Sequence, residues 1–329
     1  MTFLVSGGSG FIGSAVVRAL LARRATVRVL VRPTSKRTNL TGANVELVEG
    51  DLRDPASLAR AVKGCEGVFH VAADYRFWVP DVGALNETNV AGTRALLSAA
   101  ADAGVRRVVY TSSVAALGGD PSGKPATEDT PVTEHDMSGH YSRSKFLAER
   151  EALALAGQGL PVVIVNPSTP IGPRDIRPTP TGRIIVEAAA GRMPAFLDTG
   201  LNVVHVEDVA EGHWLAYERG VPGERYILGG DDLTFQEILA LVSAAAGRRS
   251  PTLRLPHRVV LPMAYLAELG YRLRRPATAP MLTVDSVRML KKHMFFSSAK
   301  ARAGLGYAPR PSSEAIIDAI DWFRDNRYI

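Results

Sequence analysis

Short apolar runs alternate with amphipathic stretches along the first half of the chain. The runs are rich in β-branched residues, as expected of buried strands. In order, they are Phe3–Val5, Thr26–Val31, Val45–Val48, Gly67–Ala73, Arg107–Ser113 and Pro161–Val165. Apolar residues recur at helical spacing over Ser14–Arg23, Pro55–Val62, Asn89–Ala103 and Tyr141–Ala156. Strands that alternate with helices in this way predict an α/β fold with a doubly wound parallel sheet.

The pattern changes after about Pro170. Residues 176–182 are rich in Pro and Thr, which is typical of a loop. A strand pattern at 202–206 leads into a helix, and helical patterns fill much of the remaining chain. We therefore expect a sheet domain over 1–169, with contributions from about 202–222. A smaller, mainly helical C-terminal substrate lobe is expected over 170–201 and 223–329.

Glycines follow the first predicted strand at the spacing Gly7-x-x-Gly10-x-x-Gly13. Glycines between a strand and a helix let the backbone turn tightly and approach a pyrophosphate, whose charge is stabilised by the helix N-terminus. This context indicates a dinucleotide-binding Rossmann fold. The candidate cofactor contacts on this turn are Gly7, Ser9, Gly10, Phe11, Ile12 and Gly13.

The residue after the second strand distinguishes the two nicotinamide cofactors. A carboxylate there would bind the ribose 2′-hydroxyl of NAD and repel the 2′-phosphate of NADP. Arg32 stands at this position, and Thr34, Ser35, Lys36 and Arg37 follow it. Cations and hydroxyls suit a phosphate. The sequence therefore favours NADP, with NAD as the alternative.

Tyr141 and Lys145 are four residues apart in a predicted helix, and so lie on one face, one turn apart. An ammonium near a phenol favours the ionised phenol and lowers its pKa from the usual value of about 10. The pair is a candidate for proton transfer. The fifth strand ends in the hydroxyls Thr111, Ser112 and Ser113, which could stabilise charge on a substrate oxygen.

The order of these blocks resembles the extended short-chain dehydrogenase/reductase family, within the NAD-dependent epimerase/dehydratase superfamily. The match covers nearly the whole chain. The similar blocks are Gly7-x-x-Gly10-x-x-Gly13, Gly50–Asp54, Val71–Ala73, Asn89-Val90-x-Gly92-Thr93, Tyr110–Ser113, Tyr141-x-x-x-Lys145, Pro167 with Gly172-Pro173, His205-Val206-x-Asp208-Val209-Ala210 and Ser298–Tyr307.

The resemblance implies a role for each matching residue. Tyr141 would be the general acid/base, Lys145 would bind the nicotinamide ribose, and Ser113 would hydrogen-bond the substrate oxygen. His205 and Asp208 are expected to support the structure. The remaining implied cofactor contacts are Asp51 and Leu52 beside the adenine, Ala72, Ala73 and Thr111 along the cofactor, and Pro167 at the nicotinamide.

The segment Ala72–Trp78 also resembles the bacterial hopanoid-associated group, whose members are labelled sugar epimerases or dihydroflavonol-reductase-like proteins. The residues expected to contact substrate are Tyr75, Arg76, Trp78, Ser112 and Ser168. An equal alternative is that Tyr75, Arg76 and Trp78 pack under the C-terminal lobe and do not contact substrate.

Three classes of function remain open. The first is carbonyl reduction, as in the dihydroflavonol reductase and 3β-hydroxysteroid dehydrogenase branch, which Arg32 favours. The second is nucleotide-sugar epimerisation or dehydration. It is weakened by Thr169, Leu201 and Asn202, because many such enzymes carry an Asn or an Arg for the sugar diphosphate at these places. The third is a non-catalytic NADP-binding regulator, against which an intact Tyr141, Lys145 and Ser113 argue.

Charge and composition narrow the partners. The net charge is +6, but the 39 basic residues are scattered, which argues against nucleic-acid binding. The single Cys65 excludes an internal disulfide, and the seven His show no metal-binding spacing, so no metal is expected. No signal peptide or membrane span is visible, and we expect a cytoplasmic protein with a small-molecule substrate, sugar-derived or lipidic.

Two further expectations concern association. Residues 257–275 are strongly apolar with Arg at both ends, so this segment could contact a membrane surface or admit a lipidic substrate. More often, such a segment is a helix of the lobe that covers the cleft. The family resemblance also implies a homodimer, with Asn89–Ala103 and Tyr141–Ala156 at its interface.

Overall fold

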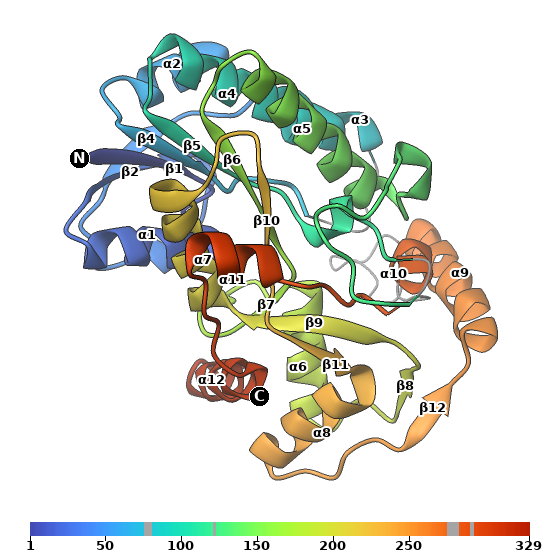
Figure 1. Ribbon diagram of the computed structural model, residues 1–329. Coiled ribbons are helices and arrows are strands. Elements are labelled where there is room, and N and C mark those ends of the chain that lie inside the picture. The colour runs from blue at the N-terminus through green and yellow to red at the C-terminus, as the bar shows by residue number, and fades with distance from the viewer. Residues whose placement is uncertain (76–80, 121–122, 275–282, 290–292) are drawn as a thin grey trace.

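A seven-stranded, all-parallel sheet forms the centre of the molecule (Figure 1). The computed structural model describes residues 1–75, 81–120, 123–274, 283–289 and 293–329. The strand order β10-β6-β5-β4-β1-β2-β3 confirms the predicted doubly wound topology. The strands are β1 (Thr2–Ser6), β2 (Thr26–Val31), β3 (Glu46–Glu49), β4 (Gly67–His70), β5 (Arg107–Thr111), β6 (Val162–Pro167) and β10 (Arg225–Leu228).

Helices cover both faces of this sheet, because strands buried on both sides need an apolar cover on each. One face carries α1 (Phe11–Ala22), α7 (Val206–Arg219) and α11 (Ala299–Leu305). The other carries α2 (Pro55–Val62), α4 (Gly92–Asp102) and α5 (His140–Gly157). The shorter helical segments are α3 (Val82–Asn86), a π-helical turn (Glu87–Ala91) that joins α3 to α4, and the 3₁₀ turns Thr38–Leu40, Val114–Ala116 and Glu134–Asp136.

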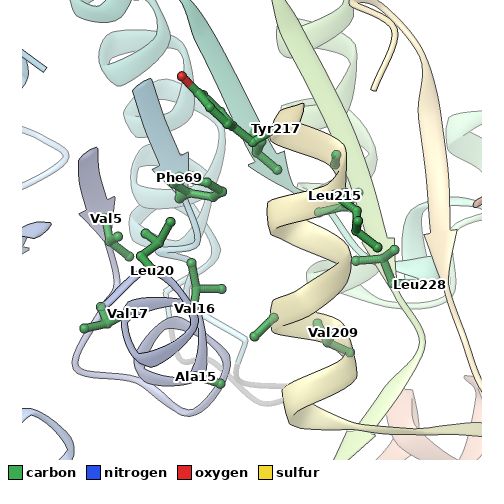
Figure 2. Packing of buried hydrophobic residues seen from close by; sticks show 14 of the residues in the cluster. Val5, Ala15, Val16, Val17, Leu20, Phe69, Val209, Leu215, Tyr217 and Leu228 are labelled. Carbon is green, nitrogen blue, oxygen red and sulfur yellow. The ribbon is translucent and has the colours of Figure 1, made fainter. Parts of the chain in front are cut away.

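The core beneath α1 and α7 holds these two helices against the sheet. Figure 2 shows Leu20 of α1 and Val209 of α7 converging on side chains of the strands. An aromatic cluster closes the amino-terminal end of this layer, with the rings of Phe3 and Tyr217 5.0 Å apart in an edge-to-face arrangement. The opposite end of the layer, where the strands have their carboxyl ends, remains open for the functional site.

The strand order reverses between β1 and β4. β1 pairs with β2 on one side and with β4 on the other, so the loops that follow β1 and β4 diverge to opposite faces of the sheet. In open α/β sheets, ligands bind in the crevice at such a point, outside the carboxyl ends of the strands. The glycine turn follows β1 at this position, and Val71–Ala73 follows β4.

The C-terminal lobe has its own core and two small sheets. Side chains from α6, α8 and α12 form this core, including Ile185, Phe235, Ile316 and Phe323. The lobe contains β7 (Thr169–Ile171), β8 (Ala195–Leu197), β9 (Gly200–His205), β11 (Asp231–Thr234), β12 (Leu253–Leu255), α6 (Pro180–Ala189), α8 (Phe235–Ala246), α9 (His257–Arg274), α10 (Val284–Met289) and α12 (Ser312–Asp325).

Strand β10 shows how the two parts of the chain interleave. Its sequence lies within the range expected for the lobe, but it pairs in parallel with β6 and forms the edge of the main sheet. Only four residues long, it cannot be assigned to a sheet from its apolar pattern alone. Helix α7, within the range 202–222, packs against α1 on one face of the main sheet.

Candidate active site

The turn after β1 depends on close backbone contacts that only glycine allows. Gly7 has φ 72°, and a Cβ there would lie 2.7 Å from the Ala72 Cα. A Cβ on Gly13 would lie 2.1 Å from the Gly7 carbonyl oxygen. The Gly10 N–H donates to that same oxygen at 2.9 Å, and α1 then begins at Phe11. The first-turn N–H groups of a helix lack intrahelical partners, so this turn suits a pyrophosphate.

Asn39, which lies between β2 and β3, connects this turn to a loop of the C-terminal lobe. Its side-chain amide donates to the Ser9 carbonyl at 3.5 Å and to the Arg174 carbonyl at 3.2 Å. Arg174 has φ 71°, which is uncommon for a residue with a side chain. Burial, and secondarily Arg174, lower the pKa of Arg18 in α1 to about 10. Two guanidinium groups beside α1 suit an anion, so Arg174 joins the cofactor candidates although the sequence reasoning missed it.

The end of β2 presents the cation on which the cofactor prediction rests. Arg32 is exposed, and its carbonyl accepts a hydrogen bond from the Ser35 N–H at 2.9 Å, which fixes a turn. The Asp51 carboxylate is bound by Arg53, whose Nη2 lies 2.9 Å from Oδ2. That hydrogen bond is the main reason why the pKa of Asp51 falls to about 2, and Arg32 adds to the effect. Leu52 is buried against Gly92 of α4.

Lys145 is buried on α5 at the carboxyl end of β5. Its Nζ donates to the Thr111 carbonyl at 2.7 Å and to the Tyr110 hydroxyl at 3.4 Å. Burial lowers the pKa of Lys145 to about 8, while Glu149 acts in the opposite direction. The Thr111 side chain faces the other side of the sheet and contacts the His213 Nε2 at 2.8 Å. Thr111 therefore holds the lysine through its carbonyl group.

Tyr141 stands one turn before Lys145 on α5 and is partly exposed. Burial of its hydroxyl raises the pKa of Tyr141 to about 12, and a hydrogen bond with the Ser113 side chain partly offsets this. The pKa depression predicted from the spacing is thus not seen at this phenol. The phenol is protonated at neutral pH, as a free tyrosine also is, so it carries a proton to donate although burial makes it a weaker acid.

Asn89 ties the segment after β4 to the helix of Tyr141. Its Oδ1 accepts from the Asp74 N–H at 2.7 Å, and its Nδ2 donates to the Asp74 carbonyl at 2.8 Å and to the Ser144 Oγ at 3.0 Å. Tyr75 follows and lies close enough to Tyr141 to raise its pKa. Tyr75 therefore lies in the neighbourhood of the candidate proton donor Tyr141. Arg76 and Trp78 lie outside the described residues.

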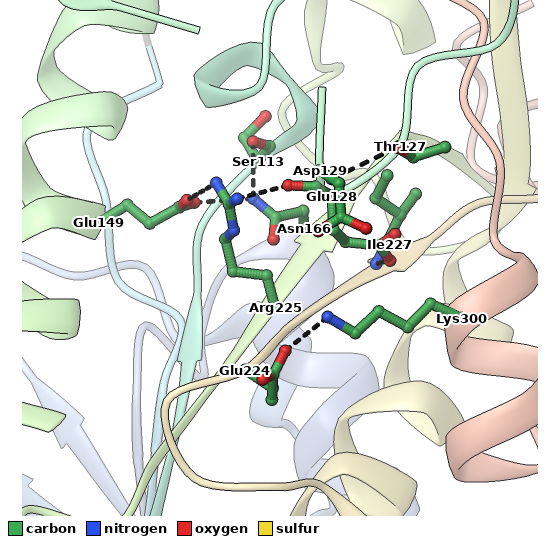
Figure 3. A network of polar contacts seen from close by, with 10 residues as sticks. All are labelled: Ser113, Thr127, Glu128, Asp129, Glu149, Asn166, Glu224, Arg225, Ile227 and Lys300. Carbon is green, nitrogen blue, oxygen red and sulfur yellow. Dashed lines mark hydrogen bonds and ion pairs between the residues drawn. The ribbon is translucent and has the colours of Figure 1, made fainter. Parts of the chain in front are cut away.

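A network of hydrogen bonds and an ion pair connects the Ser113 backbone to β6, α5 and β10 (Figure 3). Asn166 Nδ2 donates to the Ser113 carbonyl at 3.1 Å and to the Glu149 Oε2 at 2.8 Å. The other Glu149 oxygen lies 3.3 Å from the Arg225 Nη1, which brings in the edge strand β10. Removal of one partner from a buried ion pair is costly, so this network fixes the spacing of β5, β6 and α5.

The remaining substrate candidates lie at the ends of β5 and β6. Ser112 is buried near Tyr110, and its hydroxyl oxygen has no hydrogen-bond partner among the described residues. The Ser168 hydroxyl has no hydrogen-bond partner among the described residues, and Pro167 next to it is buried. An unsatisfied buried hydroxyl calls for an explanation, and a ligand contact is one.

The histidines in the site region have structural partners. His70 lies between Ser6, 2.7 Å from Nδ1, and Thr93, 2.9 Å from Nε2. Burial lowers its pKa to about 3, so the ring is neutral. His205 caps α7 by accepting from the Glu207 N–H at 3.0 Å. Among the described residues, no group of three or more His, Cys, Asp or Glu is arranged to hold a metal ion.

Asp208 also has a structural partner. It receives the Arg310 N–H at 2.9 Å and the Arg310 Nε at 3.0 Å, and so links α7 to the chain segment before α12. This contact agrees with the expectation that the His205 and Asp208 block supports the structure.

Comparisons with known proteins identify the family. Residues 3–229 match the NAD dependent epimerase/dehydratase family, and the chain belongs to it. Its blocks and fold are those of the extended short-chain dehydrogenase/reductase enzymes, so the protein is an NAD(P)-dependent oxidoreductase of that type.

Named relatives cover the whole chain. It is 43% identical to a putative dihydroflavonol 4-reductase of Synechocystis sp., over 99% of this chain and 96% of the relative. It is 38% identical to sterol demethylase protein B of Methylococcus capsulatus, over 100% of both chains. The crystal structure of gox2253 superposes with a TM-score of 0.89 at 51% identity, covering 100% of this chain and 99% of that chain.

The names of more distant relatives include both carbonyl reductases and sugar-nucleotide epimerases or dehydratases. Some are named ketoreductases, reductases and dehydrogenases. Solved structures with the same fold include sugar-nucleotide dehydratases and epimerases with NAD bound. Among the helices that the structure describes, none has the length and apolar character needed to span a membrane.

Proposed function

We propose that this protein is an NADPH-dependent reductase of a carbonyl group on a small, apolar substrate. The observation that carries the proposal is the hydrogen-bonded pair of Tyr141 and Ser113 beside the buried Lys145. The phenol of Tyr141 is protonated at neutral pH, so it can donate a proton to a substrate oxygen in the reductive direction.

The chemistry follows from these positions. When bound, the nicotinamide cofactor supplies the hydride that reduces the carbonyl carbon. Negative charge then develops on the carbonyl oxygen, to which Tyr141 donates its proton and the Ser113 hydroxyl donates a hydrogen bond. The Lys145 ammonium, held by the Thr111 carbonyl, places a positive charge at the end of β5 where the ribose of the cofactor would lie.

Carbonyl reduction is favoured over sugar-nucleotide chemistry by the state of two residues in β9. Leu201 is buried, and the Asn202 amide donates to the Gly230 carbonyl at 3.2 Å, the Asp232 Oδ1 at 2.7 Å and the Phe296 carbonyl at 3.1 Å. Neither side chain is available to bind a diphosphate. Titration with UDP-sugars should show no binding, whereas tight binding would support the epimerase/dehydratase alternative.

The substrate class rests on the relatives. The names of two relatives refer to a dihydroflavonol and to a sterol, which are flat or lipidic molecules. Tyr75 and Ser168 are the proposed substrate contacts among the described residues. A screen of water-soluble and lipidic carbonyl compounds with NADPH tests this class, and oxidation of NADPH by none of them would contradict it.

Further parts of the proposal concern the state of the protein. We infer a cytoplasmic homodimer in which α4 and α5, both rich in Ala and Leu, pair with those of a second copy. Light scattering tests this inference, and a monomer at micromolar concentration would refute it.

Replacing Arg32 with Glu should reverse the cofactor preference. The new carboxylate would repel a 2′-phosphate, and a charge-assisted hydrogen bond would be lost, so the Kd for NADPH should rise by about 100-fold. The Kd for NADH should change little or fall. Fluorescence titration of both cofactors measures the ratio. Arg60→Glu, an exposed site on α2, is the control for net charge. An unchanged NADPH/NADH ratio would remove Arg32 from the 2′-phosphate site.

A further inference from the structure

Helix α9 exposes an apolar face to solvent. Val259, Met263, Leu266 and Leu273 follow one another at spacings of four, three and seven residues, so they share one side of the helix. Their exposed fractions run from 49% at Val259 and Met263 to 77% at Leu273. Of the thirteen exposed large hydrophobic residues among those described, seven lie between Leu253 and Leu273. Such a concentrated patch marks an interaction surface.

The opposite side of α9 already has a partner. Val260 and Ala264 are buried against Val284 and Val287 of α10 and against Leu197. The Glu268 carboxylate accepts a hydrogen bond from the Val284 N–H at 2.8 Å, and so the single acid of the helix faces α10. The exposed apolar face is therefore a second face, separate from the one that secures the helix to the lobe.

The charge of the chain is concentrated around this helix. Residues 248–288 contain eight of the 39 Lys and Arg but only two of the 33 Asp and Glu. Their formal charge of +6 equals that of the whole chain, so the rest of the sequence is neutral overall. Arg258 is exposed on α9, and Arg288 of α10 donates to the hydroxyl of Tyr265 on α9 at 2.9 Å. Apolar side chains with cations nearby complement an anionic lipid surface, where the cations meet headgroups.

Helix α9 lies near the active site, because its neighbour α10 contacts the start of α5. Helix α10, packed on α9, reaches the start of α5, where a Cβ on Gly139 would lie 2.7 Å from the Asp285 Oδ2. Tyr141 is two residues further along α5. Figure 1 shows α9 and α10 together at one side of the molecule, near this end of α5.

We propose that the exposed face of α9, formed by Val259, Met263, Leu266 and Leu273, docks the enzyme on an anionic membrane surface. The helix lies in the headgroup region, with its apolar side chains in the lipid and the neighbouring arginines on the phosphates. A carbonyl substrate dissolved in lipid then has a short path to Tyr141, a consequence that rests on the proposed function.

Vesicle flotation with the full chain tests the docking surface. Vesicles of phosphatidylcholine with an equal share of phosphatidylglycerol should carry the protein, and vesicles of phosphatidylcholine alone should carry much less. Leu266→Glu should lower the partition coefficient on the anionic vesicles by about tenfold or more, because it loses apolar burial and adds a repelled charge. Arg258→Glu should weaken binding to the anionic vesicles only. Ile317→Glu, at an exposed site on α12, is the matched control and should bind as the unchanged protein does.

Three outcomes would overturn the docking surface. These are no flotation with anionic vesicles, equal flotation of the Leu266→Glu and Ile317→Glu variants, or a concentration-dependent dimer that Leu266→Glu abolishes in the absence of vesicle binding. NADPH binding confirms that each variant is folded. Turnover of a water-soluble carbonyl compound should be unchanged in Leu266→Glu. It measures the proposed function separately, so failure of one is distinguishable from failure of the other.

Discussion

Tyr141→Phe is expected to lower kcat for carbonyl reduction by about 10³-fold, within the range that a positioned general acid contributes. The substitution removes only the hydroxyl group, which donates the proton and bonds to Ser113. The aromatic ring and its packing remain, so the Kd for NADPH should change by less than about threefold. Steady-state kinetics and a fluorescence titration measure the two quantities.

The matched control is Tyr217→Phe, which also removes only a tyrosine hydroxyl. That hydroxyl donates to the Glu66 Oε1 at 3.4 Å at the opposite end of the sheet. Its kcat should stay within about twofold of the unchanged protein. If the Tyr141 variant kept a tenth or more of the activity, another group would have to supply the proton.

Lys145→Met is expected to reduce kcat/KM for reduction by at least about 100-fold and to stabilise the fold. Burial lowers the pKa of Lys145 from 10.5 to about 8, so keeping the ammonium in the folded state costs up to about 3 kcal/mol at neutral pH. The variant should gain up to that amount in free energy of unfolding, measured in urea at pH 7.

The contribution of Lys145 to the free energy of unfolding should depend on pH. The folded protein loses the proton of Lys145 near pH 8, whereas the unfolded chain keeps it to pH 10.5. Between these values the unfolded state binds more protons, so the stability of the unchanged protein should rise with pH through this window. The Lys145→Met variant should lack that rise. Reductase activity should fall over the same window as the ammonium is lost, and parallel pH–stability curves for the two proteins would contradict the assignment.

Much of the fold, and the residues of the candidate site, could be predicted from the sequence because both depend on local signals. The alternation of strands and helices predicts the parallel sheet, and the glycine spacing predicts the turn at Gly7. Boundaries were less exact. Helix α1 begins at Phe11, not at Ser14, because the glycine turn itself caps the helix at Gly10. Helix α6 likewise begins at Pro180, within the predicted loop, because Thr179 caps it.

The supporting contacts could not be predicted, since they join residues far apart in the chain. Asn89 reaches Asp74 and Ser144, and Asn166 links the Ser113 carbonyl to Glu149. Such pairs depend on which elements become neighbours. The orientation of Thr111 was within reach of sequence reasoning, because side chains alternate along a strand and only one of Tyr110 and Thr111 can face α5.

The fate of the hydride tests the central claim most directly. With the best carbonyl substrate from the screen and NADPH carrying deuterium at its transferable position, the account predicts one deuterium on the new carbinol carbon for each NADP formed. Mass spectrometry of the product measures the label, and Tyr141→Phe should slow its transfer by about 10³-fold. Conversion of a sugar nucleotide by the oxidised cofactor, with deuterium from the substrate carbon returned to the sugar and no net change in the cofactor, would contradict the account and identify an epimerase.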